Sequence, residues 1–340
     1  MAYVPGKIYL AGPFHGAPFS LVAVTSAVVG PFDLGTVVLR FGLTIDPYTA
    51  QVSVTPTSAE PIPTILRGIV THVRDIRVYI DRNKFTLNPT SCNPLKIGST
   101  LTSDLGASKT VTSPFQASNC QALGFKPIFK VSTSGKTSRS KGASLTVKLS
   151  YPAGAQANIS KVKVDLPKQL PSRLTTLQKA CTAAQFNANP AGCPAASRVG
   201  QAKAVTPLIP VPLEGPAYFV SHGGEAFPSL IMVLQGYGVT IDLVGTTFIN
   251  KAGITSSTFK TVPDQPVGSF ELTLPQGKFS ALAANGNLCK SKLTMPTQFD
   301  AQNGATVHQS TKITVTGCPK QKKAKKAKHK KTSKHGKKKK

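Results

Sequence analysis

The residues best suited to chemistry are the histidines ahead of the Lys-rich end of the chain, namely His15, His72, His222 and His308. None of them belongs to an HExxH motif or stands beside a cysteine or carboxylate at metal-ligand spacing. His222 lies in Ser-His-Gly-Gly, which is composed like part of an oxyanion loop, but no Gly-x-Ser-x-Gly motif is present to supply a nucleophile. We therefore expect these histidines at the surface or in loops, without a catalytic role.

Two other patterns invite a chemical interpretation. Gly135-Lys136-Thr137 ends like a phosphate-binding loop, but Lys130 occupies the position where that loop needs glycine, and no helical pattern follows. Asp104 and Asp300 are too isolated to form a calcium cage. The sequence therefore predicts no enzyme, no cofactor and no metal site.

Two segments of the chain carry the same residues in the same order. At a constant offset of 209, Gly6 and Tyr9 recur as Gly215 and Tyr218, Ser20-Leu21 as Ser229-Leu230, and Asp33-Leu34 as Asp242-Leu243. The offset then falls to about 198, where Gly106-Ala107 and Cys120 recur as Gly304-Ala305 and Cys318. Because ordered self-similarity indicates duplicated structural units, we interpret residues 6–120 and 215–318 as two copies of one domain.

The six cysteines are expected to form disulfides. Six cysteines permit 15 pairings, so spacing alone does not decide between them. The duplication matches a pair 28 residues apart in the first copy with a pair 29 residues apart in the second, which leaves a local pair between the copies. We therefore predict the disulfides Cys92–Cys120, Cys181–Cys193 and Cys289–Cys318; the alternative is six buried thiols.

The compartment follows from the same cysteines. There is no CxxC motif and few histidines lie nearby, which argues against zinc. Disulfides persist in oxidising compartments, so the cysteines favour an extracellular protein.

Period-two patterns predict strands with one wet face. Alternation of apolar and polar residues occurs in residues 76–81, 145–151, 162–166 and 270–274, and turn residues separate these runs. One helix is expected at 172–184, capped by Ser172, with Leu174, Leu177, Cys181 and Ala184 on one face. Many short strands with one short helix predict an all-β chain of tandem antiparallel, Ig-like β-sandwiches.

The expected organisation has four parts. Residues 1–124 form a sandwich that holds the first repeat copy, residues 125–214 form a smaller β-rich domain with the helix, and residues 215–318 form a sandwich that holds the second copy. Residues 319–340 form a disordered Lys-rich tail. With 40% hydrophobic residues in 340, the chain has enough apolar material for packed cores.

Positive charge is concentrated in that tail. The chain has a formal net charge of +28, and residues 319–340 contain 13 lysines and no acid, so 28 − 13 leaves +15 on the preceding residues. Like charges and the lack of large apolar residues predict an extended, mobile polycation that binds polyanions; the alternative is a tail that only aids solubility. The candidate polyanion-binding residues are Lys320, Lys322, Lys323, Lys325, Lys326, Lys328, Lys330, Lys331, Lys334, Lys337, Lys338, Lys339 and Lys340.

Several strings carry a family resemblance. NPTSCNPL (88–95), SPFQASNC (113–120), VKVDLPKQLPSRLTTLQKAC (162–181), CPAASRVGQA (193–202) and TVPDQPVGSFELTLPQGKFSALAANGNLC (261–289) resemble those of uncharacterised, repeat-containing secreted β-rich proteins of actinobacterial type. The resemblance covers nearly all of residues 6–318. It implies export and repeated β-rich units, and it transfers no catalytic residue.

The first residues do not have the features of an export signal. Residues 1–6 contain no basic start, no apolar stretch and no cleavage motif. Two interpretations follow: the protein is cytoplasmic, or the sequence is the C-terminal part of a longer exported polypeptide whose signal lies upstream.

Two classes of function fit these observations. The first is a non-enzymatic extracellular or cell-surface structural or adhesive protein, which the tail retains on anionic wall polymers or lipid headgroups. The second is a cytoplasmic nucleic-acid-binding protein that uses the tail without sequence specificity. No apolar run is long enough for a transmembrane helix, and oligomeric state and ligand are not encoded in recognisable motifs.

Overall fold

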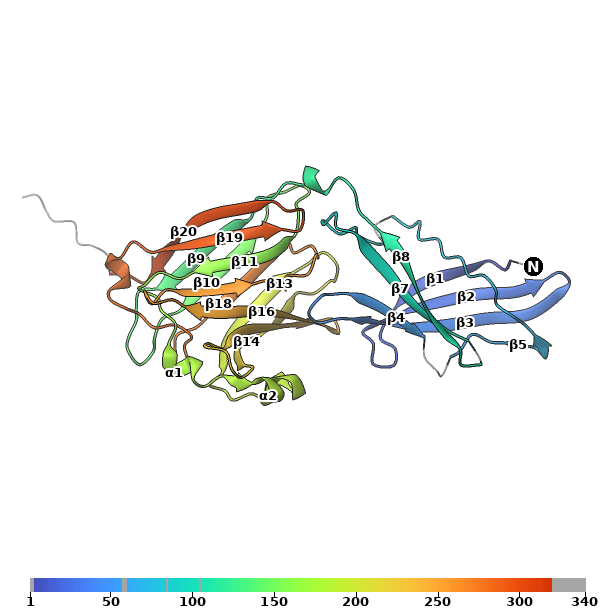
Figure 1. Ribbon diagram of the computed structural model, residues 1–340, viewed down its shortest axis with the longest axis horizontal. Coiled ribbons are helices and arrows are strands. Elements are labelled where there is room, and N and C mark those ends of the chain that lie inside the picture. Colours follow the sequence, from blue (N-terminus) through green and yellow to red (C-terminus); the bar gives the residue numbers. More distant parts are fainter. Residues whose placement is uncertain (1–2, 57–59, 84, 104, 320–340) are drawn as a thin grey trace, which may run out of the picture.

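The computed structural model describes residues 3–56, 60–83, 85–103 and 105–319. Most regular structure in these ranges is β-strand, so the all-β prediction is confirmed. Figure 1 shows two parts: a large rounded sheet and a smaller group of strands that extends from one end of it. Among the described residues, no helix is long and apolar enough to cross a membrane.

Eleven strands close into one sheet. Its order is β14-β13-β18-β10-β9-β20-β19-β11-β17-β16-β15, and β15 pairs back with β14. The neighbours are antiparallel except β9 and β20, which run parallel. The strands are β9 (Ile128–Ser134), β10 (Leu145–Ser150), β11 (Ile159–Asp165), β13 (Arg198–Val205), β14 (Leu213–Ser221), β15 (Ser229–Gly236), β16 (Val239–Ile249), β17 (Thr255–Phe259), β18 (Ser269–Leu274), β19 (Thr294–Ala301) and β20 (Thr306–Thr316).

This closed sheet corrects the expected tandem sandwiches. The boundary expected between residues 214 and 215 falls inside β14, and strands from 125–214 and 215–318 alternate around the same sheet. The period-two patterns of β10, β11 and β18 describe strands with one buried face, but such a pattern does not say which strands become neighbours. The two segments therefore share one core.

The interior of the closed sheet is filled with side chains. The inward-facing side chains of the strands form one buried cluster, which includes Val147, Leu272 and Met295. The connections 166–177 and 281–293 add leucines to the same cluster, which fills the space that strand side chains alone do not occupy. The interior is thus a packed core.

The single helix expected over 172–184 is wrong. In its place the structure has the short helices α1 (Leu174–Leu177) and α2 (Ala183–Ala188), separated by the short strand β12 (Cys181–Thr182). β12 pairs in parallel with β14, and the Cys181–Cys193 disulfide holds the chain there, so residues 181–182 are extended. The Thr182 side chain, and not that of Ser172, caps a helix by accepting a hydrogen bond from the Gln185 N–H of α2.

The remaining strands form what we call the N-terminal unit. A four-stranded antiparallel sheet contains β1 (Gly6–Ala11), β2 (Phe19–Val29), β3 (Phe32–Ile45) and β4 (Val52–Pro56). Two separate hairpins follow, β5 (Ile65–Leu66) with β6 (Ile69–Val70), and β7 (Leu95–Thr102) with β8 (Ser108–Phe115). The strand expected over residues 76–81 is absent, because this segment pairs with no other strand among the described residues.

The N-terminal unit contacts the closed sheet at several places, including the following two. At the first, the Phe19 ring packs against Tyr237 with 5.7 Å between centroids, and the Asp242 N–H donates to the Pro47 carbonyl. At the second, the Asp264 carboxylate accepts hydrogen bonds from the loop that contains Thr90. The two parts therefore meet through both apolar and polar contacts.

Candidate functional site

An open hollow lies on the outer face of the closed sheet where β11, β16, β17 and β19 meet. Its volume is about 470 Å³. Val164 of β11 packs into the core, so the alternating neighbours Lys163 and Asp165 face the opposite side. The lining residues are Lys163, Asp165, Leu166, Pro167, Gln169, Phe248, Asn250, Ile254, Ser256, Lys292, Thr294 and Pro296.

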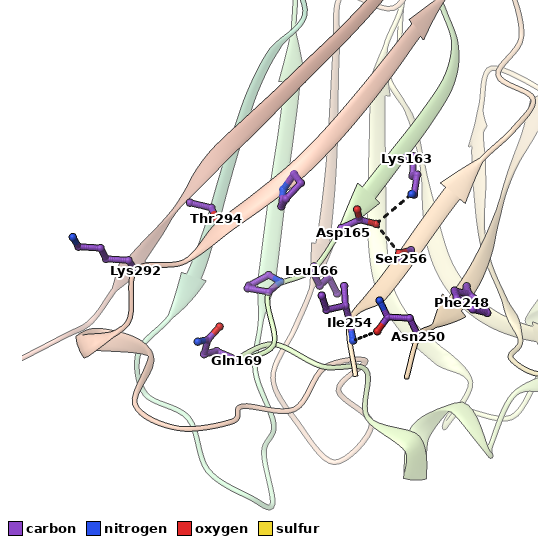
Figure 2. Close-up of a pocket in the computed structure, with 12 residues that line it drawn as sticks. Lys163, Asp165, Leu166, Gln169, Phe248, Asn250, Ile254, Ser256, Lys292 and Thr294 are labelled. Carbon is purple, nitrogen blue, oxygen red and sulfur yellow. Dashed lines mark hydrogen bonds and ion pairs between the residues drawn. The ribbon is translucent and has the colours of Figure 1, made fainter. Parts of the chain in front are cut away.

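A small polar network occupies one side of this hollow (Figure 2). The Ser256 hydroxyl donates to Asp165 Oδ1 at 2.6 Å, and Lys163 Nζ lies 3.9 Å from the same oxygen. Asn250 Oδ1 accepts from the Ile254 N–H at 3.0 Å and thereby closes the turn between β16 and β17. The Ser256 hydroxyl thus fixes the Asp165 carboxylate, and Lys163 lies beside it on the same face of β11.

The network does not form a catalytic triad. A serine nucleophile needs an imidazole between itself and the carboxylate, and here Ser256 bonds directly to Asp165. His308 lines an adjoining hollow of about 410 Å³ together with Lys163 and Asp165. In the described ranges no hydrogen bond joins His308 to Ser256 or Asp165. The hollow offers the Lys163 and Lys292 ammonium groups and the Gln169 amide, which suit a polar or anionic ligand better than acid–base chemistry.

The cysteines form the three disulfides that the sequence predicts. Cys92 is joined to Cys120, Cys181 to Cys193 and Cys289 to Cys318. The first and third stand next to the hairpins β7–β8 and β19–β20, respectively, and the second stands beside α2. Three disulfides are typical of an oxidising, extracellular environment.

One carboxyl group has a strongly altered acidity. Burial raises the pKa of Asp242 from 3.8 to about 6. Its Oδ1 is buried and has no hydrogen-bond partner among the described residues. Asp242 lies on β16 where the N-terminal unit docks, and burial followed by the charges of Asp242 and Asp46 raises the pKa of Tyr48. This carboxyl group is thus a feature of the junction between the two parts.

The other residues singled out by sequence are scattered. His222 lies after β14, where its N–H donates to Glu225, while His15 and His72 lie in the N-terminal unit. No group of three or more His, Cys, Asp or Glu within the described part of the chain is arranged to hold a metal ion. The 13 lysines from Lys320 to Lys340 lie outside the described residues.

Two polar groupings were not identified from sequence. The alternation that places Lys163 and Asp165 on a wet face is visible in the sequence, but Ser256, their neighbour, is 91 residues from Asp165. Asp264 bonds to Thr90 across 174 residues, and no pattern around either residue marks them as partners.

Comparisons of the chain with protein-family models, curated proteins and solved structures gave no match.

Proposed function

We propose that this protein is a non-enzymatic structural or adhesive repeat protein of the cell exterior, retained on anionic material by its Lys-rich end. The observation that carries the proposal is the build of the body: a closed sheet and a second group of strands, each with a disulfide beside one of its hairpins. Such cross-linked β units suit a stalk or spacer outside the cytoplasm. The hollow beside Lys163 lacks a nucleophile with its base, which supports a binding role over catalysis.

The Lys-rich end supplies the attachment. Thirteen lysines without an acid occur in residues 319–340. Each lysine near an anionic surface contributes on the order of 1 kcal/mol, so together the thirteen are enough to retain the protein on such a surface. The attraction is electrostatic, and it weakens as the Debye length falls from about 10 Å at 0.1 M salt to about 3 Å at 1 M.

Sedimentation with anionic surfaces tests this proposal. The full chain and a chain that ends at Pro319 are mixed with phosphatidylglycerol vesicles and with purified wall fragments, at low and at high salt. We expect the full chain to sediment at low salt only, and the shortened chain to remain in solution with an unchanged circular dichroism spectrum. A chain with all 13 tail lysines replaced by glutamine is the matched control, because it keeps the length and loses the charge.

Two results would contradict the proposal. Equal sedimentation of the full and shortened chains would show that the tail does not anchor the protein. Displacement of the full chain from both vesicles and wall fragments by a small amount of duplex DNA, at unchanged salt, would favour the nucleic-acid function instead.

A further inference from the structure

The first hairpin of the N-terminal unit has the same strand register as a hairpin in the closed sheet. β1 and β2 pair Leu10 with Leu21, and β14 and β15 pair Phe219 with Leu230. Each residue of the second pair is numbered 209 higher than its counterpart in the first pair. β1 and β2 therefore have β14 and β15 as their counterparts, and β3 and β4, next in the same sheet, correspond to β16 and β17.

The same holds for the hairpin that follows. β7 and β8 pair Leu95 with Phe115, and in the closed sheet the Ile313 N–H donates to the Leu293 carbonyl. Both partners differ by 198 residue numbers, so β7 and β8 correspond to β19 and β20. This assignment places the Cys92–Cys120 disulfide at the position of Cys289–Cys318.

A third correspondence concerns residues 76–80. Lys84-Phe85 recurs as Lys278-Phe279 at an offset of 194, and the same offset aligns Ile76, Val78 and Ile80 with Phe270, Leu272 and Leu274 of β18. The two runs share an apolar and polar alternation. Only the second run is a strand.

Among the described residues, β1, β4, β7 and β8 of the N-terminal unit lack the neighbours that their counterparts have in the closed sheet. In the closed sheet, β14 pairs with β13, β17 and β19 pair with β11, β20 pairs with β9, and β18 lies between β10 and β13. All four of these neighbours come from residues 128–205. In the described part of the N-terminal unit, the corresponding sides of β1, β4, β7 and β8 pair with nothing, and residues 76–80 have no partner strand. The unit thus has strands that correspond to those of the closed sheet, but none in the described residues that corresponds to β9, β10, β11 or β13.

Apolar side chains are exposed where those strands are missing. Leu101 is 61% exposed and its counterpart Phe299 is 1% exposed; Val78 is 54% exposed and Leu272 is 7% exposed. Exposed apolar side chains beside unpaired strand edges mark a binding surface. The surface consists of the free edges of β1, β4, β7 and β8 together with residues 76–80.

The outer face gives independent support. Tyr218 of β14 is 5% exposed because Phe186 of α2 packs on it edge to face, with ring centroids 5.9 Å apart. Its counterpart Tyr9 is 51% exposed. Residues 125–214 contain α2 as well as the four strands. The lack of a counterpart of this segment among the described residues of the N-terminal unit therefore explains both the exposed Tyr9 and the exposed apolar side chains at the strand edges.

We infer that this surface binds a four-stranded segment, patterned like residues 125–214 and carried by a partner polypeptide, which inserts between β1, β4, β7 and β8 and completes a second closed sheet. A second copy of this chain is not the occupant, because each copy has one such segment and already uses it in its own closed sheet. Strand addition of this kind provides main-chain hydrogen bonds for affinity and side-chain pockets for specificity.

The segment that binds this surface should differ from residues 125–214 in the charge of one outward-facing residue. Glu271 of β18 lies in register with Lys148 on one side and Lys203 on the other, and Lys148 Nζ is 2.9 Å from its carboxylate. The position equivalent to Glu271 is Arg77, which in this chain pairs with Asp75 at 2.9 Å on the surface. Like charges directly opposite on a sheet are destabilising. The occupant therefore carries an acidic residue where residues 125–214 carry Lys148.

The test uses a second copy of residues 121–214 as the probe. The copy is joined ahead of Gly6, as Glu214 precedes Gly215 in the natural chain, and the rest of the chain is kept. Three versions are compared: the unmodified copy, a copy with Lys148→Glu, and a copy with Val147→Glu. Val147 points into the core and Lys148 points outward, so the same acid is placed on opposite faces of one strand.

Amide hydrogen exchange of residues 76–80 is the readout. We expect the Lys148→Glu copy to slow it on the order of 1,000-fold or more, because core strands exchange only when a large unit opens. The unmodified copy slows it less, and the Val147→Glu copy leaves it unchanged. Continued protection of residues 269–274 in β18 shows in every version that the original closed sheet is folded.

Three results would overturn the inference. The first is unchanged exchange of residues 76–80 with all three copies. The second is equal protection by the Val147→Glu and Lys148→Glu copies, which would mean that no inward-facing strand is inserted. The third is concentration-dependent protection of these amides in the unextended chain, which would identify a second copy as the occupant.

Discussion

The Thr90 hydroxyl donates a 2.7 Å hydrogen bond to Oδ1 of Asp264 and so joins the N-terminal unit to the closed sheet. Asp264 Oδ2 also accepts from the backbone N–H groups of Thr90 and Ser91, at 2.8 and 2.9 Å. The Asn158 amide donates to Oδ1 at 2.8 Å. One carboxylate thus satisfies four donors from two distant segments, and the following prediction depends on it.

We expect Asp264→Ala to loosen this junction. The change leaves two backbone donors without an acceptor, which costs about 2 kcal/mol, or roughly a 30-fold change in the local opening equilibrium. Hydrogen exchange of residues 88–93 should accelerate by that factor, while β18 stays protected. Asp81→Asn, an exposed carboxylate outside the junction, is the control; equal exchange rates in Asp264→Ala and the natural chain would contradict the prediction.

From the raised pKa of Asp242 we predict that the stability of the protein depends on pH. Its pKa is raised to about 6 in the folded chain, so the folded chain holds this proton more tightly than the unfolded chain does. Its contribution is therefore most favourable below about pH 4, declines as the pH rises towards about 6, and is constant above that. Urea unfolding should show Asp242→Asn gaining stability relative to the natural chain across this interval.

The control for this experiment is Asp33→Asn, at the equivalent position of the N-terminal unit. This variant retains Asp242, so the difference between low and neutral pH that Asp242 causes should persist. A constant difference between Asp242→Asn and the natural chain from about pH 4 to about pH 7 would disprove the assignment.

Loss of the Cys289–Cys318 disulfide should destabilise the closed sheet. The bond closes a loop with a sequence separation of 29, for which the chain-entropy model gives about 3.5 kcal/mol. We expect the double variant Cys289→Ser and Cys318→Ser to lower the free energy of unfolding by about this amount in urea. A count of free thiols in the natural, unreduced protein checks the premise, since reactive thiols at these positions would mean that the bond is absent.

A substitution at Gly135 tests how closely the backbone packs on the Cys289–Cys318 disulfide. A Cβ added at residue 135 would lie 2.9 Å from Cys318 Sγ and 3.2 Å from Val315 Cγ1. Gly135→Ala should therefore lower stability in the oxidised protein, and by less in the Cys289→Ser, Cys318→Ser background, where the smaller side chains can turn away. Additive effects in this double-mutant cycle would show that Gly135 and the disulfide do not interact.

The sequence predicts individual strands better than it predicts their neighbours. Residues 76–81 and 270–274 have the same alternation, yet only the second run is a strand, because β10 and β13 lie on its two sides. Alternation shows which face of a strand can be buried, and it contains no information about whether partners exist. The cysteine pairs were predictable because the duplication matched one pair with another.

The closure of the sheet and the candidate site were hidden for a related reason. β9 meets β20 by pairing Val131 with Ile313, which are far apart in sequence, and the connection has no turn signal. At the hollow, Lys163 and Asp165 could be placed on a wet face from sequence, but their contact with Ser256 depends on β11 lying beside β17. Long-range pairing therefore determined both the fold and the site.

The parallel pairing of β9 with β20 has a consequence for how the protein is made. The ribosome delivers β9 first and β20 last, so the sheet stays open until residue 316 has emerged, and only then can Cys318 reach Cys289. Until that moment the core side chains of β9 and β10 face water, and the nascent chain needs protection from aggregation. Translation that stops before β20 would release a sheet in which β9 and β19 both lack the neighbour that closes it.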